Sequence, residues 1–243
     1  MDTTTHDSGA TLQMGITGAT LNIVGILLSG PSGLALVSIV HPSPPWQGAA
    51  TYAANFHWIQ TVPFFGGFAL VIGYVIMFAA IYLIADSRQK PAAMVSVIAT
   101  AAFATLIFFN YICQTTFVPA LASDYRPEYD PLITAFSLAT PLSLSWAIEM
   151  WGYALLGLAT AFSATVFHRN KVERAAALLM ILNGTISIIG AIVTSFSLGW
   201  VLTVPGIVSY AIWNILVFAM AILILVSFRK RRSEIEPASS FSG

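Results

Sequence analysis

Residues 59 to 84 read IQTVPFFGGFALVIGYVIMFAAIYLI and contain no charged side chain. A helix needs about 20 predominantly apolar residues to cross the hydrocarbon core of a bilayer, where every backbone amide must be bonded internally. This stretch therefore predicts a membrane-spanning α-helix.

Five further stretches of similar composition accompany it. Of the 243 residues, 57% are hydrophobic and only 8% are charged, whereas about 25% are charged in an average soluble domain. A water-facing surface could not be built from this composition, so we predict an all-α fold, a bundle of six transmembrane helices in lipid. The predicted spans are Met14 to Val40, Ile59 to Ile84, Ala92 to Val118, Leu142 to Phe167, Arg174 to Phe196 and Val204 to Phe228.

The chain is thus divided into a transmembrane domain, residues 14–228, and two tails. Residues 1–13 carry no Lys or Arg, unlike the start of a cleaved secretory signal, so the first span is expected to be retained behind an N-terminal tail. Residues 229–243 open with RKRR, expected to contact anionic headgroups. The polar remainder predicts a disordered C-terminal tail.

Basic residues set the expected orientation, because Lys and Arg collect in cytoplasmic loops. Nine of the ten basic residues fall in or beside the loops after the second, fourth and sixth spans, and only Arg126 lies on the other side. We therefore expect both termini in the cytoplasm and a multi-pass protein of the plasma membrane. The short loops and compact size suggest a prokaryotic inner membrane.

Glu149 is the one carboxylate well inside a predicted span. Placing such a charge near the bilayer centre costs about 2.5 to 3.5 kcal/mol, so it normally faces the bundle interior or a water-filled cavity. Counted from Leu142 at 1.5 Å per residue, Glu149 lies roughly 10 Å below the outer boundary. Ser145 and Tyr153, at i−4 and i+4, extend one polar stripe on the same helix face.

The third span brings two amides to a similar depth. Asn110 lies roughly 12 Å from the outer end of that span, and Gln114 follows one turn later on the same face. His57, at the outer start of the second span, is close enough in depth to cap the cluster. The predicted ligand-binding or proton-binding residues are Glu149, Asn110, Gln114, Tyr153, Ser145 and His57.

Two interpretations of this cluster are open. In one, Glu149, Asn110 and Gln114 line an outward-facing pocket, where Glu149 exchanges a proton or pairs with a cationic group. In the other, a protonated Glu149 hydrogen-bonds a neighbouring helix and serves packing alone. Asn183 and Asn214, in the fifth and sixth spans, are expected to have the packing role.

Two proline-marked breaks also have two interpretations. Gly30-Pro31-Ser32-Gly33 interrupts the first span, and Thr140-Pro141 precedes the fourth. Transporters often bind substrate at helix breaks in matching positions of two halves. The alternative is a packing kink and a loop proline, and the sequence shows no similarity between its halves.

The first functional hypothesis is a small transporter or ligand-binding membrane protein with a pocket at Glu149. The second is a non-catalytic accessory or scaffolding subunit, which would be a filled bundle with an exposed face of small residues. An enzyme is less expected, because the sequence assembles no nucleophile, base and orienting group. We predict no catalytic residue, cofactor or metal site; His41 and His57 lack carboxylate or cysteine support.

The expected partners follow from the same observations. They are the lipid bilayer, a small molecule or cation, and either a second copy of the chain or another membrane subunit. The ten acidic and ten basic residues leave no net charge, so we expect no nucleic acid partner.

Overall fold

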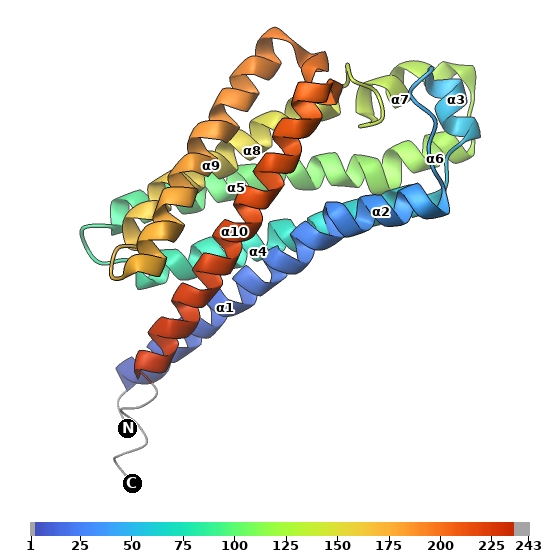
Figure 1. Ribbon diagram of the computed structural model, residues 1–243. Coiled ribbons are helices and arrows are strands. Elements are labelled where there is room, and N and C mark those ends of the chain that lie inside the picture. The colour runs from blue at the N-terminus through green and yellow to red at the C-terminus, as the bar shows by residue number, and fades with distance from the viewer. Residues whose placement is uncertain (1–2, 236–243) are drawn as a thin grey trace.

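The computed structural model describes residues 3–235, which form helices and connecting loops without any β-strand. Six helical segments are long and apolar enough to cross a membrane, so the predicted all-α bundle of six spans is confirmed (Figure 1). Its long elements are α1 (Thr3–Ser29) with α2 (Pro31–Val40), α4 (Val62–Ile84), α5 (Lys90–Ile112) with α6 (Val118–Ser123), α8 (Leu144–Ser163), α9 (Lys171–Phe196) and α10 (Val204–Ile235). The short helices α3 (Ala49–Ala54) and α7 (Asp130–Phe136) lie in two connections.

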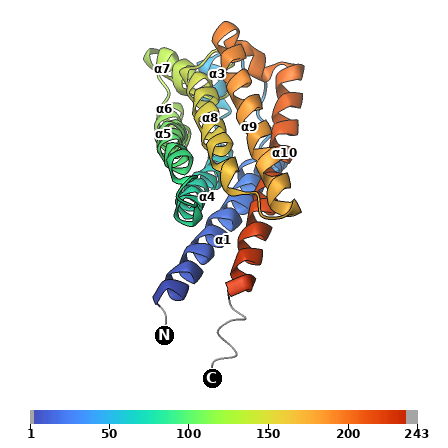
Figure 2. The same ribbon diagram turned by 90° about the vertical axis from the view of Figure 1, so that its left-hand side faces the viewer.

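The first and last helices are longer than the sequence indicates. Residues 3–13 and 229–235, expected as tails, continue α1 and α10, and Figure 2 shows both helices running beyond the rest of the bundle. The segment expected to be disordered from residue 236 onward lies outside the described residues. Residues 3–13 and 229–235 of the predicted tails are therefore helical.

A buried ion pair corrects the expectation for Arg231. Instead of contacting headgroups, Arg231 is only 5% exposed and its Nε donates to Glu173 Oε1 at 2.8 Å. Its Nη2 donates to the Val166 carbonyl, and Glu173 Oε2 accepts from the backbone of His168 and Arg169. Buried charges need partners, and these contacts supply them to both Arg231 and Glu173. The network thereby connects the end of α10 to the turn between α8 and α9.

Close packing of α1 on α4 depends on glycines. A Cβ added to Gly18 would lie 2.6 Å from the backbone nitrogen of Met77, and one added to Gly73 would lie 2.7 Å from that of Asn22. Small residues let membrane helices approach closely, and Gly157 on α8 similarly meets Gly184 on α9.

The two proline positions differ in structure. At Gly30 the chain passes from α1 into α2, and Pro31 occupies the first turn of the new helix, where its missing amide is tolerated. Thr140-Pro141 lies in the loop between α7 and α8. The first span is therefore a broken helix and the second proline is a loop residue.

The sequence does not reveal a π-helical turn, Cys113–Phe117, between α5 and α6. Pro119 follows it and cannot donate a backbone hydrogen bond, which favours a local change of helical repeat. The turn includes Gln114, one of the predicted site residues.

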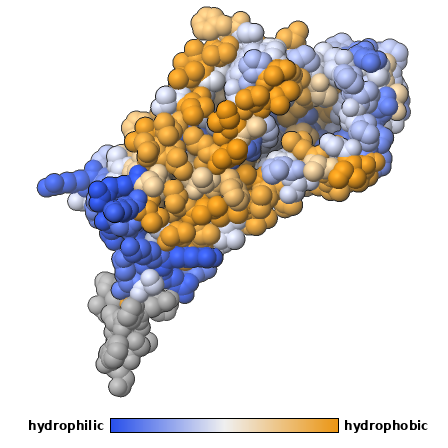
Figure 3. Space-filling model, in the orientation of Figure 1, coloured by the Kyte–Doolittle hydropathy of each residue, from blue (hydrophilic) through white to orange (hydrophobic). Residues whose placement is uncertain are grey.

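The two ends of the bundle differ in polarity. Both termini and the basic loops at Arg88–Lys90 and Arg169–Lys171 share one end, and Figure 3 shows hydrophilic residues gathered at the terminal end beside a broad hydrophobic surface. Along the bundle, α2 packs mainly on α1 and α4, while α10 packs on α1 and α9. The helices spread apart at the end opposite the termini, and the candidate site lies between them.

Candidate functional site

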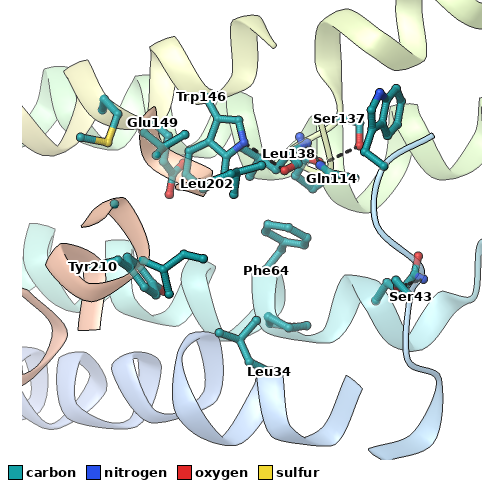
Figure 4. Close-up of a pocket in the computed structure, with 18 of the residues that line it drawn as sticks. Leu34, Ser43, Phe64, Gln114, Ser137, Leu138, Trp146, Glu149, Leu202 and Tyr210 are labelled. Carbon is teal, nitrogen blue, oxygen red and sulfur yellow. Dashed lines mark hydrogen bonds between the residues drawn. The ribbon is translucent and has the colours of Figure 1, made fainter. Parts of the chain in front are cut away.

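A cavity of about 870 Å³ occupies the end of the bundle away from the termini. Residues of α2, α3, α4, α5, α8, α9 and α10 line it, together with the loops that join them. In Figure 4, Glu149, Trp146 and Gln114 lie on one wall and Leu34 and Phe64 face them from the other. Pockets for small molecules typically measure about 300 to 1,000 Å³ and often lie between helices of a bundle.

Glu149 borders this cavity and is held by two donors from α5. Asn110 Nδ2 donates to Glu149 Oε2 at 2.6 Å, and the Tyr111 hydroxyl donates to Oε1 at 3.2 Å. The Tyr111 and Tyr153 hydroxyl oxygens lie 3.1 Å apart. Asn110 also donates to the Ser145 carbonyl at 3.1 Å. Both oxygens of the carboxyl group are thus fixed in direction.

A second group of polar contacts fixes the wall beside Glu149. Gln114 Nε2 donates to the Phe136 carbonyl at 2.7 Å, and Gln114 Oε1 accepts from the Leu138 amide at 3.0 Å. Ser145 Oγ donates to the same Phe136 carbonyl, and Trp146 Nε1 donates to the Leu138 carbonyl. The loop after α7 is therefore fastened to α5 and α8 through side chains.

Aromatic rings form the wall contributed by α10. Trp213 meets Tyr153 edge to face with centroids 4.8 Å apart and stacks on Tyr210 at 6.3 Å. Trp213 Nε1 donates to Asn183 Oδ1 at 2.9 Å, and Asn183 Nδ2 donates to Thr160 on α8. Asn183 thus joins three helices, as expected, and holds the aromatic wall.

The cavity lining contains an acidic side chain without a basic partner. Among the described residues that line it, Glu149 is the only carboxylate and there is no Lys, Arg or His. The ion pairs of Arg126 with Asp124 and of Arg231 with Glu173 involve neither Glu149 nor the cavity wall. Tyr52 also lines the cavity. Burial raises the pKa of its phenol, and this effect is larger than the opposing effect of a hydrogen bond with Ser137, so Tyr52 offers a neutral hydroxyl.

Five of the six predicted site residues come together. Glu149, Gln114 and Tyr153 line the cavity, while Asn110 and Ser145 bond to them from behind. The residues brought together are Glu149, Asn110, Gln114, Tyr153 and Ser145.

The sixth residue, His57, is separate from this group. Its ring stacks on His41 with centroids 4.9 Å apart, and its Nδ1 accepts from the Ile59 amide. His57 does not line the cavity, although Gln60 and Thr61 do. Within residues 3–235, no group of three or more His, Cys, Asp or Glu side chains is placed to hold a metal ion.

Several cavity residues were not found from the sequence. Tyr111 follows Asn110 directly and bonds the same carboxyl group, and Trp146 and Trp213 read as ordinary apolar residues of their spans. A tyrosine beside an intramembrane asparagine, opposite a glutamate of matching depth, is a signal that could have identified Tyr111. Trp213 had no comparable signal.

Comparison with protein-family models, curated proteins and solved structures finds no match for this chain.

Proposed function

We propose that the protein binds a small molecule with an apolar body and one cationic or strongly hydrogen-bond donating group, and that Glu149 receives this group. The observation that carries the proposal is a carboxyl group without a basic partner on the wall of a cavity large enough for such a molecule. Binding of this kind would serve a small transporter or a ligand-binding membrane protein.

The lack of a basic partner for Glu149 favours binding over simple packing. A carboxylate within the membrane is costly unless it is paired or hydrated. Asn110 and Tyr111 supply hydrogen bonds but no opposite charge. A ligand cation would supply it, and the aromatic rings of Trp213, Tyr210 and Trp146 around the cavity suit a cation with an apolar body.

The cavity also favours this function over that of an accessory subunit. A subunit that only packs against partners was expected to be a filled bundle, whereas this bundle has a cavity bordered by Glu149. We further propose that the terminal end, with its basic loops, faces the cytoplasm of a plasma membrane. The cavity then opens toward the outside.

The experiment is a binding titration of the full chain in nanodiscs with 4-phenylbutylammonium. Its neutral counterpart, 4-phenylbutan-1-ol, has a similar size and shape. The fluorescence of the cavity tryptophans reports occupancy; these are Trp46, Trp146, Trp200 and Trp213. We expect the ammonium compound to bind at least about tenfold more tightly than the alcohol, since hydrogen bonds to a charged group contribute about 1.5 to 3 kcal/mol.

Glu149→Gln is the test variant because it removes the charge and keeps the shape. We expect it to abolish the preference for the ammonium compound. Glu128→Gln, at an exposed carboxylate outside the cavity, is the matched control and should keep that preference. Equal binding of both compounds to the wild-type protein would refute the proposal.

A further inference from the structure

The cavity has an opening in its side, at a depth within the membrane. Leu34 on α2 and Ile207 on α10 both line the cavity, yet they are 48% and 55% exposed. α2 packs mainly on α1 and α4, and α10 on α1 and α9, so α2 and α10 do not pack extensively on each other. Figure 3 shows the surface hollowed between the start of α10 and α2.

The depth of this opening follows from helix geometry. Leu34 lies six residues before the end of α2 at Val40, and Ile207 lies three residues after the start of α10 at Val204. At 1.5 Å per residue, Leu34 lies about 9 Å and Ile207 about 4.5 Å inside the ends of their spans. The opening therefore faces the acyl chains of one leaflet rather than water alone.

The residues that border the opening are suited to a hydrocarbon chain. Leu34 and Ile207 at the opening are apolar, and the α9 wall of the cavity adds Ile186, Ile189 and Val193, which are partly exposed. An alkyl chain could lie across them without leaving an apolar environment. Glu149, the single charged group, lies on the same cavity wall as Trp146.

We infer that the natural ligand is a single-chain amphiphile with a cationic head, which enters from the bilayer through the gap between α2 and α10. Its head pairs with Glu149, and its chain extends through the gap into the lipid. This inference rests on the proposed function and adds the class of ligand and its route. A cavity that is open to lipid accepts an amphiphile whose alkyl chain is longer than the cavity, because the surplus extends into the bilayer. A closed cavity would exclude such a ligand.

Chain-length tolerance is therefore the test. Radiolabelled n-alkylammonium ions of 8, 12 and 16 carbons are equilibrated with protein-loaded and empty nanodiscs at equal mole fraction in the lipid. The excess bound to loaded discs gives the affinity without the contribution of membrane partitioning. We expect the three affinities to agree within about threefold, because the surplus chain remains in an apolar medium, as it was in the lipid.

Two variants narrow the gap, Leu34→Trp from α2 and Ile207→Trp from α10. Each should weaken binding of the 16-carbon ion by about tenfold or more relative to the 8-carbon ion, because an added ring and a chain would overfill one space. Ile39→Trp is the matched control on α2: Ile39 is 82% exposed and lies outside the cavity lining. It should leave all three affinities unchanged.

The outcomes separate this inference from the proposed function. A chain-length limit in the wild-type protein, or no effect of either tryptophan in the gap, would overturn lateral entry. If no alkylammonium ion bound in excess while 4-phenylbutylammonium still bound through Glu149, the amphiphile would be excluded and the binding function would remain. Failure of both probes would remove both proposals.

Discussion

At the scale of single residues, Asn110 is the side chain that positions Glu149. Its amide donates both to the Glu149 carboxyl group and to the Ser145 carbonyl, so it joins α5 to α8 through two bonds. The residue is fully buried. A buried acceptor that loses its donor costs about 1 to 3 kcal/mol.

Asn110→Ala should therefore destabilise the protein by about 1 to 3 kcal/mol. The measurement is reversible unfolding in mixed micelles, followed by circular dichroism. Asn214→Ala is the control, because Asn214 Nδ2 donates only to the Tyr210 carbonyl of its own helix. A loss for Asn214→Ala as large as that for Asn110→Ala would contradict this role.

The pair of Arg231 and Glu173 gives a second prediction at this scale. Glu173→Gln should cost about 3 to 5 kcal/mol, because it leaves the Arg231 guanidinium buried without its counter-charge. Asp124→Asn breaks the exposed pair with Arg126 and should cost less than about 1 kcal/mol. Chemical denaturation measures the free energy of unfolding of both variants. Equal decreases in this free energy would show that burial of the pair is unimportant.

At the scale of elements, glycines set the distance between α1 and α4. Gly73→Ala should destabilise the bundle by about 1 to 3 kcal/mol, because the added methyl group would overlap the backbone of Asn22. Gly9→Ala, where a Cβ meets nothing within 4 Å, should be neutral or slightly stabilising. Thermal unfolding compares the stability of the two variants. If Gly73→Ala did not lower the stability, α1 and α4 could move apart at little cost.

The sequence predicted the helices better than their ends and irregularities. Apolar length located all six spans, because a bilayer permits few other structures. It missed the extension of α10 to Ile235, since the stability of that turn comes from Glu173, which is remote in sequence. The π-helical turn before Pro119 was missed because several local geometries can accommodate a proline.

At the scale of the whole molecule, the sequence could align polar residues by depth but could not locate empty space. Equal depth brought Glu149 and Asn110 together correctly, because helix rise converts residue number into height. The cavity depends on how far α2 and α10 diverge, which the periodicity of either helix does not determine. His57 was associated with the site by depth alone, yet its ring stacks on His41 and does not line the cavity.

The most direct test of the central claim is the reactivity of a thiol placed in the cavity. Met150→Cys, in a Cys113→Ala background, adds a thiol beside Glu149 on the cavity lining. Leu178→Cys, exposed on the outer face of α9 and outside the cavity, is the control in lipid. Methanethiosulfonate reagents with trimethylammonium or sulfonate heads are applied to the outside of intact cells.

We predict that Met150→Cys reacts and Leu178→Cys does not, and that the cationic reagent reacts about tenfold faster than the anionic one through attraction to Glu149. Adding Glu149→Gln should abolish this preference. A thiol at position 150 that stays unreactive, or that reacts equally with both reagents while Glu149 is present, would contradict a water-accessible cavity with an unpaired carboxylate.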